Sequence, residues 1–148
     1  IDTDSLSIHQ LAELIRERIL GKKSSRLVLV FESFGFKHGI PKDADYVFDA
    51  RFLPNPHWIP DLRPLTGRDG PVSEYVLGHD ATQDFLDQLD DMLAVLMPSY
   101  VSEGKSYLSV AFGCTGGRHR SVAIAETVAE MLRGRGFDPV VSHRDVER

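Results

Sequence analysis

The chain has 148 residues, of which 42% are hydrophobic and 26% charged, and its formal net charge is -5 at pH 7. This balance excludes a disordered chain, and the net negative charge argues against a protein that binds nucleic acid over its whole surface. No apolar run approaches the ~20 residues that a membrane-spanning helix needs. The first residues lack a signal-peptide pattern, so we expect a cytoplasmic protein. The single cysteine, Cys114, excludes an internal disulfide and a multi-cysteine zinc site, and we expect no metal centre.

Apolar residues recur at helical spacing in three segments, 8–20, 81–96 and 121–133. In the second of these helices Asp80 is the expected N-cap, and Pro98 is expected to end it.

Four segments are predicted strands, at 26–32, 46–49, 107–112 and 139–143. The first is a continuous apolar run, which is typical of a strand buried on both faces of a sheet. Strands that alternate with helices predict an α/β fold, with a mainly parallel sheet covered by helices. The last two strands and the helix between them are expected to form one right-handed crossover.

A long connection rich in proline and glycine runs from Phe52 to Gly78. Connections of this length inside a domain are usually functional or disordered. Trp58, Leu62 and Leu65 predict that this one packs onto the domain.

The strongest candidate site is the loop between strand 107–112 and helix 121–133. Open α/β sheets bind ligands at the carboxyl ends of their strands, and a helix N-terminus offers free N–H groups and the positive end of its dipole. Glycines let backbone amides turn toward an anion, while arginines and hydroxyls add charge and donors. We therefore predict a site for the phosphate of a small molecule, formed by Cys114, Thr115, Gly116, Gly117, Arg118, His119, Arg120 and Ser121. The alternative is a tight strand-to-helix turn with solvated arginines.

The same loop has the spacing Cys-x5-Arg, from Cys114 to Arg120, that cysteine-dependent phosphatases use. A cysteine at a helix N-terminus beside arginines has a lowered pKa and would be a nucleophile. However, Gly113 stands where such phosphatases usually have a histidine, and no general-acid aspartate is identifiable. We favour a cysteine that lines the loop, and keep the phosphatase as the alternative.

Two further clusters follow predicted strands and should lie at the same edge of the sheet. In the first, Lys37 and His38 are placed to reach a second phosphate or a sugar hydroxyl. In the second, Arg51 and Asn55 are suitable partners for phosphate or hydroxyl groups, although Asp49 would instead pair with Arg51 and only order the loop. The C-terminal stretch 133–148 contains four arginines and is either a weak basic edge or a solvated surface.

Several long motifs of the chain closely resemble the C-terminal domain of the RapZ/YvcJ family. They are the stretches 30–41 (VFESFGFKHGIP), 45–49 (DYVFD), 51–56 (RFLPNP), 62–67 (LRPLTG), 113–117 (GCTGG) and 119–122 (HRSV). The resemblance covers nearly the whole chain.

The resemblance implies a fold similar to the sugar-binding part of phosphofructokinase. It also implies two regions, a joint over 1–25 from a missing N-terminal P-loop domain and the ligand-binding domain over 26–148. ATP or GTP binding and hydrolysis belong to the missing domain, so we expect neither an enzyme nor a cofactor in this chain.

For the C-terminal domain itself the resemblance implies sensing of glucosamine-6-phosphate, contact with a small RNA and with a protein partner, and assembly into a homo-oligomer. The RNA-binding tail of the enterobacterial members is strongly basic. Here Asp145 and Glu147 dilute that charge.

Overall fold

The computed structural model describes residues 27–148, so the predicted helix over 8–20 lies outside the described residues. In chain order the elements are β1 (Val28–Gly35), the 3-10 turn η2 (Phe36–His38), β2 (Tyr46–Asp49), the 3-10 turn η3 (Pro56–Trp58), α2 (Gly70–Leu77), α3 (Asp80–Ser102), β3 (Tyr107–Cys114), α4 (Arg120–Gly134) and β4 (Val140–His143). The predicted strands and the two predicted helices within this range are all present.

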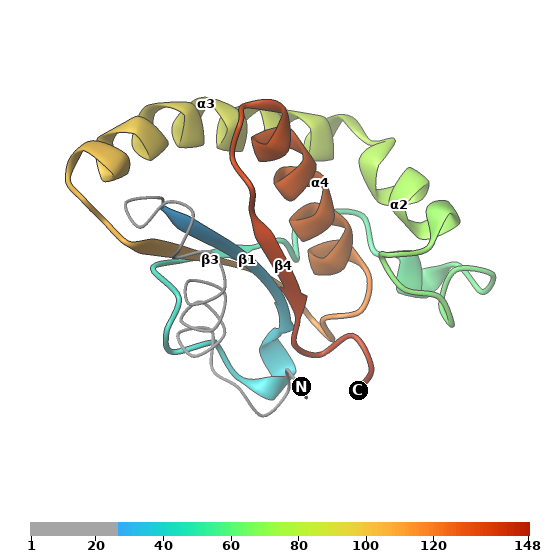
Figure 1. Ribbon diagram of the computed structural model, residues 1–148. Coiled ribbons are helices and arrows are strands. Elements are labelled where there is room, and N and C mark those ends of the chain that lie inside the picture. Colours follow the sequence, from blue (N-terminus) through green and yellow to red (C-terminus); the bar gives the residue numbers. More distant parts are fainter. Residues whose placement is uncertain (1–26) are drawn as a thin grey trace.

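The four strands of the described chain form one parallel sheet in the order β2-β3-β1-β4. Figure 1 shows β3, β1 and β4 of this sheet. The prediction of an α/β fold with a parallel sheet is confirmed. Because β1 lies between β3 and β4, the crossover through α4 passes over β1. β1 and β3 also run further than predicted, so that Gly35 and Cys114 are paired at the last position of the ladder. The ends of β1, β2 and β3 therefore bring the predicted clusters to one edge.

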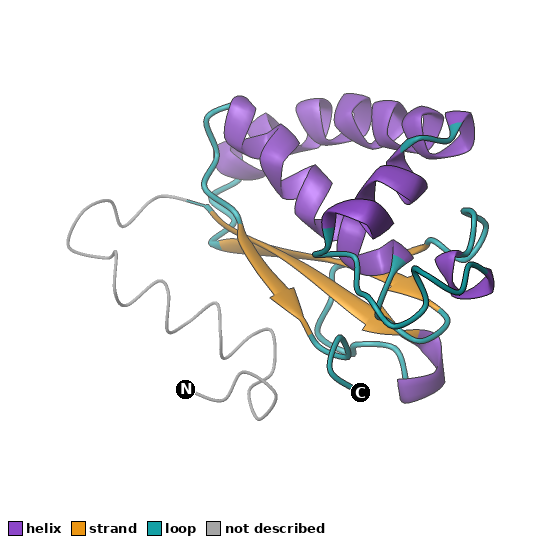
Figure 2. Cartoon of the chain, turned by 90° about the vertical axis from the view of Figure 1, so that its right-hand side faces the viewer, coloured by secondary structure: helices purple, strands orange, loops and turns teal. Residues whose placement is uncertain are grey.

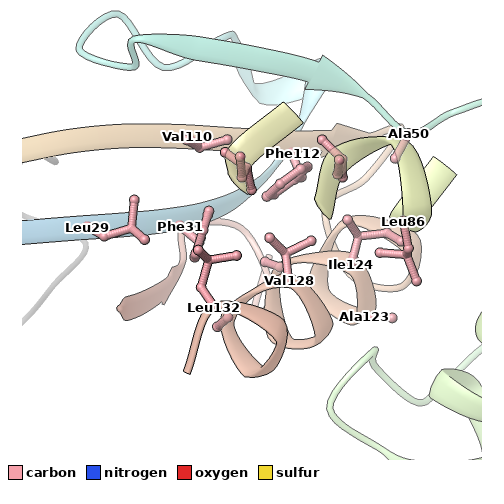
Figure 3. Packing of buried hydrophobic residues seen from close by; sticks show 14 of the residues in the cluster. Leu29, Phe31, Ala50, Leu86, Val110, Phe112, Ala123, Ile124, Val128 and Leu132 are labelled. Atoms are coloured by element: carbon pink, nitrogen blue, oxygen red, sulfur yellow. The ribbon is translucent and has the colours of Figure 1, made fainter. Parts of the chain in front are cut away.

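Helices α3 and α4 lie over one face of this sheet (Figure 2). The core between them is built from alternate side chains of the strands, such as Leu29 and Phe31 of β1, against Ile124 and Val128 of α4 (Figure 3). All eight residues of β1 are buried, as its continuous apolar run predicts. No helix within residues 27–148 has both the length and the apolar character needed to cross a membrane.

Helix α3 differs from the prediction at both ends. His79 is its N-cap and Asp80 is its first residue, so Asp80 is not the cap. The helix also continues through Pro98 to Ser102, where the sequence predicts an end. A proline inside a helix removes one hydrogen bond, but Met97 is fully buried on the core side of this turn. Burial of that side chain offsets the lost bond and keeps the helix intact.

The connection between β2 and α3 contains an unpredicted helix, α2, of only two turns. Its apolar signal is limited to Val72 and Val76, which are both buried, and the proline at its start is a helix-initiation signal. Upstream of it, Leu62 and Leu65 pack against the core as expected. Trp58 does not, because its side chain is 75% exposed.

The core packing predicts a large difference between two positions two residues apart on α3. Leu93→Ala should lower the free energy of unfolding by about 2–5 kcal/mol, because Leu93 is 1% exposed and its removal leaves a cavity. Val95→Ala is the control, since Val95 is 69% exposed, and it should change stability by less than about 0.5 kcal/mol. Urea unfolding followed by circular dichroism measures both values. Equal effects would contradict this assignment of the buried face.

Candidate functional site

The candidate site is the glycine loop, residues 115–119, between the end of β3 and the start of α4. Within residues 27–148, no acceptor is found for the backbone amides of residues 115–122. The first pairing in this region is the Ala123 amide, which donates to the His119 carbonyl at 3.0 Å. The loop therefore presents a series of free N–H donors at the positive end of the α4 dipole. Such an arrangement attracts an anion.

The shape of the glycine loop depends on close backbone packing against the end of β1. A Cβ on Gly35 would lie 2.4 Å from the Gly116 carbonyl carbon, and a Cβ on Gly117 would lie 2.6 Å from the Gly35 amide nitrogen. Gly117 also has a φ of 80°, a conformation that favours glycine. The loop thus lies directly against the β1 turn, and the Lys37 amide donates to the Thr115 carbonyl at 3.3 Å.

The guanidinium of Arg120 is buried and already has protein partners. Its Nη1 donates to the carbonyls of Arg51 and Leu53, at 2.7 and 3.1 Å, and its Nη2 donates to Thr115 Oγ1 at 3.4 Å. Arg120 is only 5% exposed. Its observed role is therefore to hold the connection after β2 against the glycine loop, with its charge close to the loop amides.

Arg118 and His119 bind a segment that the sequence did not single out as part of the site, residues 63–67. Arg118 Nη2 donates to the Pro64 carbonyl at 3.2 Å, and the Gly67 amide donates to the Arg118 carbonyl at 2.8 Å. His119 Nε2 lies 3.1 Å from the Arg63 carbonyl oxygen. Burial lowers the pKa of His119, so its ring is neutral at pH 7.

The sequence feature that could have identified the 63–67 segment as part of the site is Gly67. A Cβ at that position would lie 2.3 Å from the His119 carbonyl oxygen. His57 is a second residue that the sequence did not identify, and its carbonyl accepts from Arg63 Nε at 2.7 Å.

Cys114 lies at the end of β3, beneath the glycine loop, and is 3% exposed. Its Sγ is 3.1 Å from the hydroxyl of Ser121 in the first turn of α4. A hydroxyl in this place would stabilise a thiolate, but a nucleophile must also be reached by its substrate. The burial of Cys114, and the engagement of Arg120 Nη1 with two backbone carbonyls, favour a lining role.

The cluster after β1 contains the two side chains least occupied by protein contacts. Lys37 is exposed, and within residues 27–148 it has no ion-pair partner. Its Cε lies 4.0 Å from the place that a Cβ on Gly116 would occupy, so the ammonium group can reach the loop. His38 Nε2 is buried, with no partner in the described part of the chain.

The cluster after β2 is occupied by internal contacts. Arg51 makes a two-pronged ion pair with Asp49, and its guanidinium lies 3.9 Å from the centre of the Phe36 ring. Hydrogen bonds from Arg51 hold the pKa of the Asp49 carboxyl below its usual value. Asn55 Oδ1 accepts from the His57 amide at 3.1 Å and caps η3. Structural pairing, the alternative for Arg51, is therefore present.

The C-terminal stretch is neither a free basic edge nor a simple solvated surface, because Asp145 is fully buried in it. Its carboxylate accepts from the Gly35 amide at 2.8 Å and pairs with Arg144 and Arg148 at 2.8 and 3.2 Å. Asp145 thus pairs with two of the four arginines that the sequence offered as a basic edge and offsets one of their charges. No group of three His, Cys, Asp or Glu side chains among residues 27–148 is arranged to hold a metal ion.

Comparison with known proteins places these features in a family. Residues 27–147 match the family model described as the RapZ C-terminal domain. A nucleotide-binding protein of Pseudoalteromonas atlantica is 59% identical over 148 residues, which is 100% of this chain and 53% of that protein. The RNase adapter protein RapZ of Erwinia tasmaniensis is 53% identical over 148 residues, covering 100% of this chain and 52% of its own. The chain spans about half the length of the curated relatives it matches.

The packing of Gly35 gives a direct test of the site's construction. Gly35→Ala should destabilise the protein and shift the loop amides, because its Cβ would overlap the Gly116 backbone. The matched control is Gly134→Ala at the end of α4, where a Cβ meets nothing within 4 Å. Urea unfolding and the amide signals of Gly116 and Gly117 in NMR spectra report the two effects. A Gly35→Ala protein with unchanged loop signals would refute the close contact.

Proposed function

We propose, because this chain belongs to the family of RapZ C-terminal domains, that it is the regulatory, ligand-binding domain of a RapZ-type protein. The ligand that we propose is a phosphorylated amino sugar of the glucosamine-6-phosphate type. Its phosphate binds at the glycine loop and its sugar ring lies against the neighbouring clusters.

The observation that carries this proposal is the run of amides over residues 115–122 that have no acceptor within residues 27–148. Several N–H groups that converge at a helix start bind an oxyanion more readily than they remain merely hydrated. The exposed hydroxyl of Thr115 and the ammonium of Lys37 are the side chains available to complete the site. In this arrangement the backbone holds the phosphate, and Arg120 contributes charge from behind the loop.

The surroundings of the loop favour a phosphosugar over bare phosphate. On one side lies the β1 turn, with the unpartnered His38 Nε2, and on the other lies the connection after β2 that Arg120 holds in place. Both sides offer donors and acceptors to hydroxyl groups, and bare phosphate would use neither.

The full-length protein has further properties that we propose from the relatives. The relatives named nucleotide-binding proteins are about twice as long as this chain, and we assign ATP or GTP binding to the part that it does not match. We also propose that the protein acts in the cytoplasm as a homo-oligomer.

Removal of the Lys37 charge should weaken ligand binding. For Lys37→Met we expect an affinity for glucosamine-6-phosphate at least about tenfold lower, since a charge-assisted hydrogen bond contributes about 1.5–3 kcal/mol. Isothermal titration calorimetry on the full 148-residue chain measures this, with inorganic phosphate and glucosamine as partial ligands.

Lys42→Met is the matched control, because Lys42 is another exposed lysine of the same region and should leave the affinity unchanged. Absence of any glucosamine-6-phosphate binding to the wild-type chain would overturn the proposal. Turnover of a phosphate ester that is lost in Cys114→Ser would favour the phosphatase alternative.

A second proposed function is contact with RNA, and exposed aromatic rings favour it. Trp58 is 75% and Phe52 is 59% exposed, and both belong to the connection that also contains Arg51 and Arg63. Exposed rings beside arginines form a stacking platform for unpaired bases. The name of the Erwinia relative, an RNase adapter protein, fits such a contact. We therefore propose RNA contact at this connection rather than at the C-terminal stretch, whose four arginines all pair with acidic side chains.

Trp58→Ala should weaken binding of a single-stranded RNA by about tenfold, because stacking of one base on an aromatic ring contributes about 1–3 kcal/mol. Val95→Ala, which removes an exposed apolar side chain on α3, is the control and should have no effect. Gel shifts at several salt concentrations measure both. Equal affinities of the two variants at every salt concentration would exclude the platform.

A further inference from the structure

A chain of three side chains, of which those of Ser33 and His143 are buried and that of Glu126 is 43% exposed, connects the elements that carry the glycine loop. The hydroxyl of Ser33 on β1 lies 2.7 Å from Nδ1 of His143 on β4, and His143 Nε2 lies 2.6 Å from a carboxylate oxygen of Glu126 on α4. Ser33 is fully buried, and the His143 side chain is 8% exposed. The end of β1, the end of β4 and helix α4 are therefore joined through one imidazole ring.

The protonation state of this ring follows from its partners. An ionised carboxylate only accepts hydrogen bonds, so Nε2 of His143 carries the proton that it donates to Glu126. Nδ1 of a neutral ring is then an acceptor, and the Ser33 hydroxyl donates to it. Burial lowers the pKa of His143, and hydrogen bonding and charge from Glu126 act in the opposite direction. The ring is neutral at pH 7, and both of its nitrogens are satisfied.

Each of the three elements that these side chains join is also linked to the glycine loop. On the β1 side, Gly35 follows Ser33 by two residues and packs against the backbone of Gly116 and Gly117. On the β4 side, Asp145 follows His143 by two residues and accepts from the Gly35 amide. The third element, α4, begins at the loop itself. A change in the distance between β1, β4 and α4 therefore alters the loop.

We propose that the Ser33–His143–Glu126 chain is a pH-sensitive clamp that keeps the glycine loop in its anion-binding shape, and that acidification releases it. This inference rests on the proposed anion site and concerns its regulation. A proton on Nδ1 turns that nitrogen from an acceptor into a donor, so the fully buried Ser33 hydroxyl must turn and loses the acceptor of its own proton. It also places a charge in a buried site, which favours movement of β4 away from β1.

The charged groups that face His143 come from two elements. Glu126 on α4 stabilises the charged ring, and Arg68, from the segment before α2, opposes it. His143 has a lower pKa in the folded protein than in the unfolded chain, so its contribution to stability is present above the unfolded pKa and is lost as pH falls through the folded pKa.

Sulfate is a suitable probe, because it remains a dianion over the whole range from pH 5 to 8, whereas phosphate titrates within it. The experiment uses the full 148-residue chain and follows three quantities against pH: the ring signals of His143, the amide signals of Gly116 and Gly117 without anion, and the affinity for sulfate. All three should share one midpoint. Below it the affinity should fall, approaching about tenfold per pH unit where coupling is complete.

Glu126→Gln removes the carboxylate that favours the charged ring, and it should move all three midpoints to lower pH by the same amount. Glu130→Gln is the matched control, because Glu130 is an exposed residue one turn further along α4 and pairs with Arg133 instead. It should leave every midpoint in place. A purely structural role for Glu126 would lower stability without moving the midpoints together.

His143→Gln replaces the ring by an amide that can donate and accept but does not titrate, and it should abolish the acid loss of affinity. In this variant the affinity for sulfate should not fall between pH 8 and pH 5. Midpoints that stay in place in Glu126→Gln, or an acid loss that persists in His143→Gln, would overturn the clamp. Failure of sulfate to bind at pH 8 would overturn the anion site alone, because the Gly116 and Gly117 signals of the free protein still decide the clamp.

Discussion

The contact on which the rest of the site depends is the one between two stretches of bare backbone, Gly35 at the end of β1 and Gly116–Gly117 in the glycine loop. Gly35 and Gly117 have no room for a Cβ, since one on Gly35 would lie 2.4 Å from the Gly116 carbonyl carbon and one on Gly117 would lie 2.6 Å from the Gly35 amide nitrogen. The contact forces the loop to turn immediately after β3. As a result the free amides of residues 115–122 gather at the start of α4 instead of being spread along an extended connection. Side chains around the loop then act mainly to preserve this contact.

The backbone and the side chains of the site therefore have different roles. The sequence predicts that the loop arginines hold the anion directly. In the structure the guanidinium of Arg120 is directed to the carbonyls of residues 51 and 53, and that of Arg118 to Pro64. The cationic side chains thus organise the walls of the glycine loop, and in the function that we propose the backbone amides supply most of the donors to the anion. A fixed set of amides needs little reorganisation when an anion binds, which favours tight binding by a small ligand.

The sequence was sufficient for those parts of the fold that depend on local periodicity. The apolar run of β1, the stripe of α4 and the glycines of the loop each have a direct physical meaning, and each feature is found where it is expected. The errors have tertiary causes. Burial of Met97 carries α3 past Pro98, and α2 is too short for Val72 and Val76 to form a recognisable period.

The sequence could predict which clusters lie at the same edge of the sheet, because the carboxyl ends of parallel strands meet there. Which side chains remain free was not predictable, because that depends on partners far away in the sequence. Arg51 pairs with nearby Asp49, a possibility that the sequence shows, but His119 finds the Arg63 carbonyl 56 residues away. Asp145 reaches the Gly35 amide across 110 residues, which no local pattern records.

Asp145 also explains why the C-terminal stretch belongs to the site rather than to the surface. A buried carboxylate must be paired, and here it is satisfied by Gly35, Arg144 and Arg148 together. Loss of any one partner would leave charge in a buried place, so the stretch is locked to the end of β1. His143, two residues before Asp145, contacts the same strand through the hydroxyl of Ser33. The end of β1 is therefore held at two points by the C-terminal stretch and packed at a third against the glycine loop. Because this backbone is closely packed, a displacement of β4 should also displace the loop, as the proposed clamp requires.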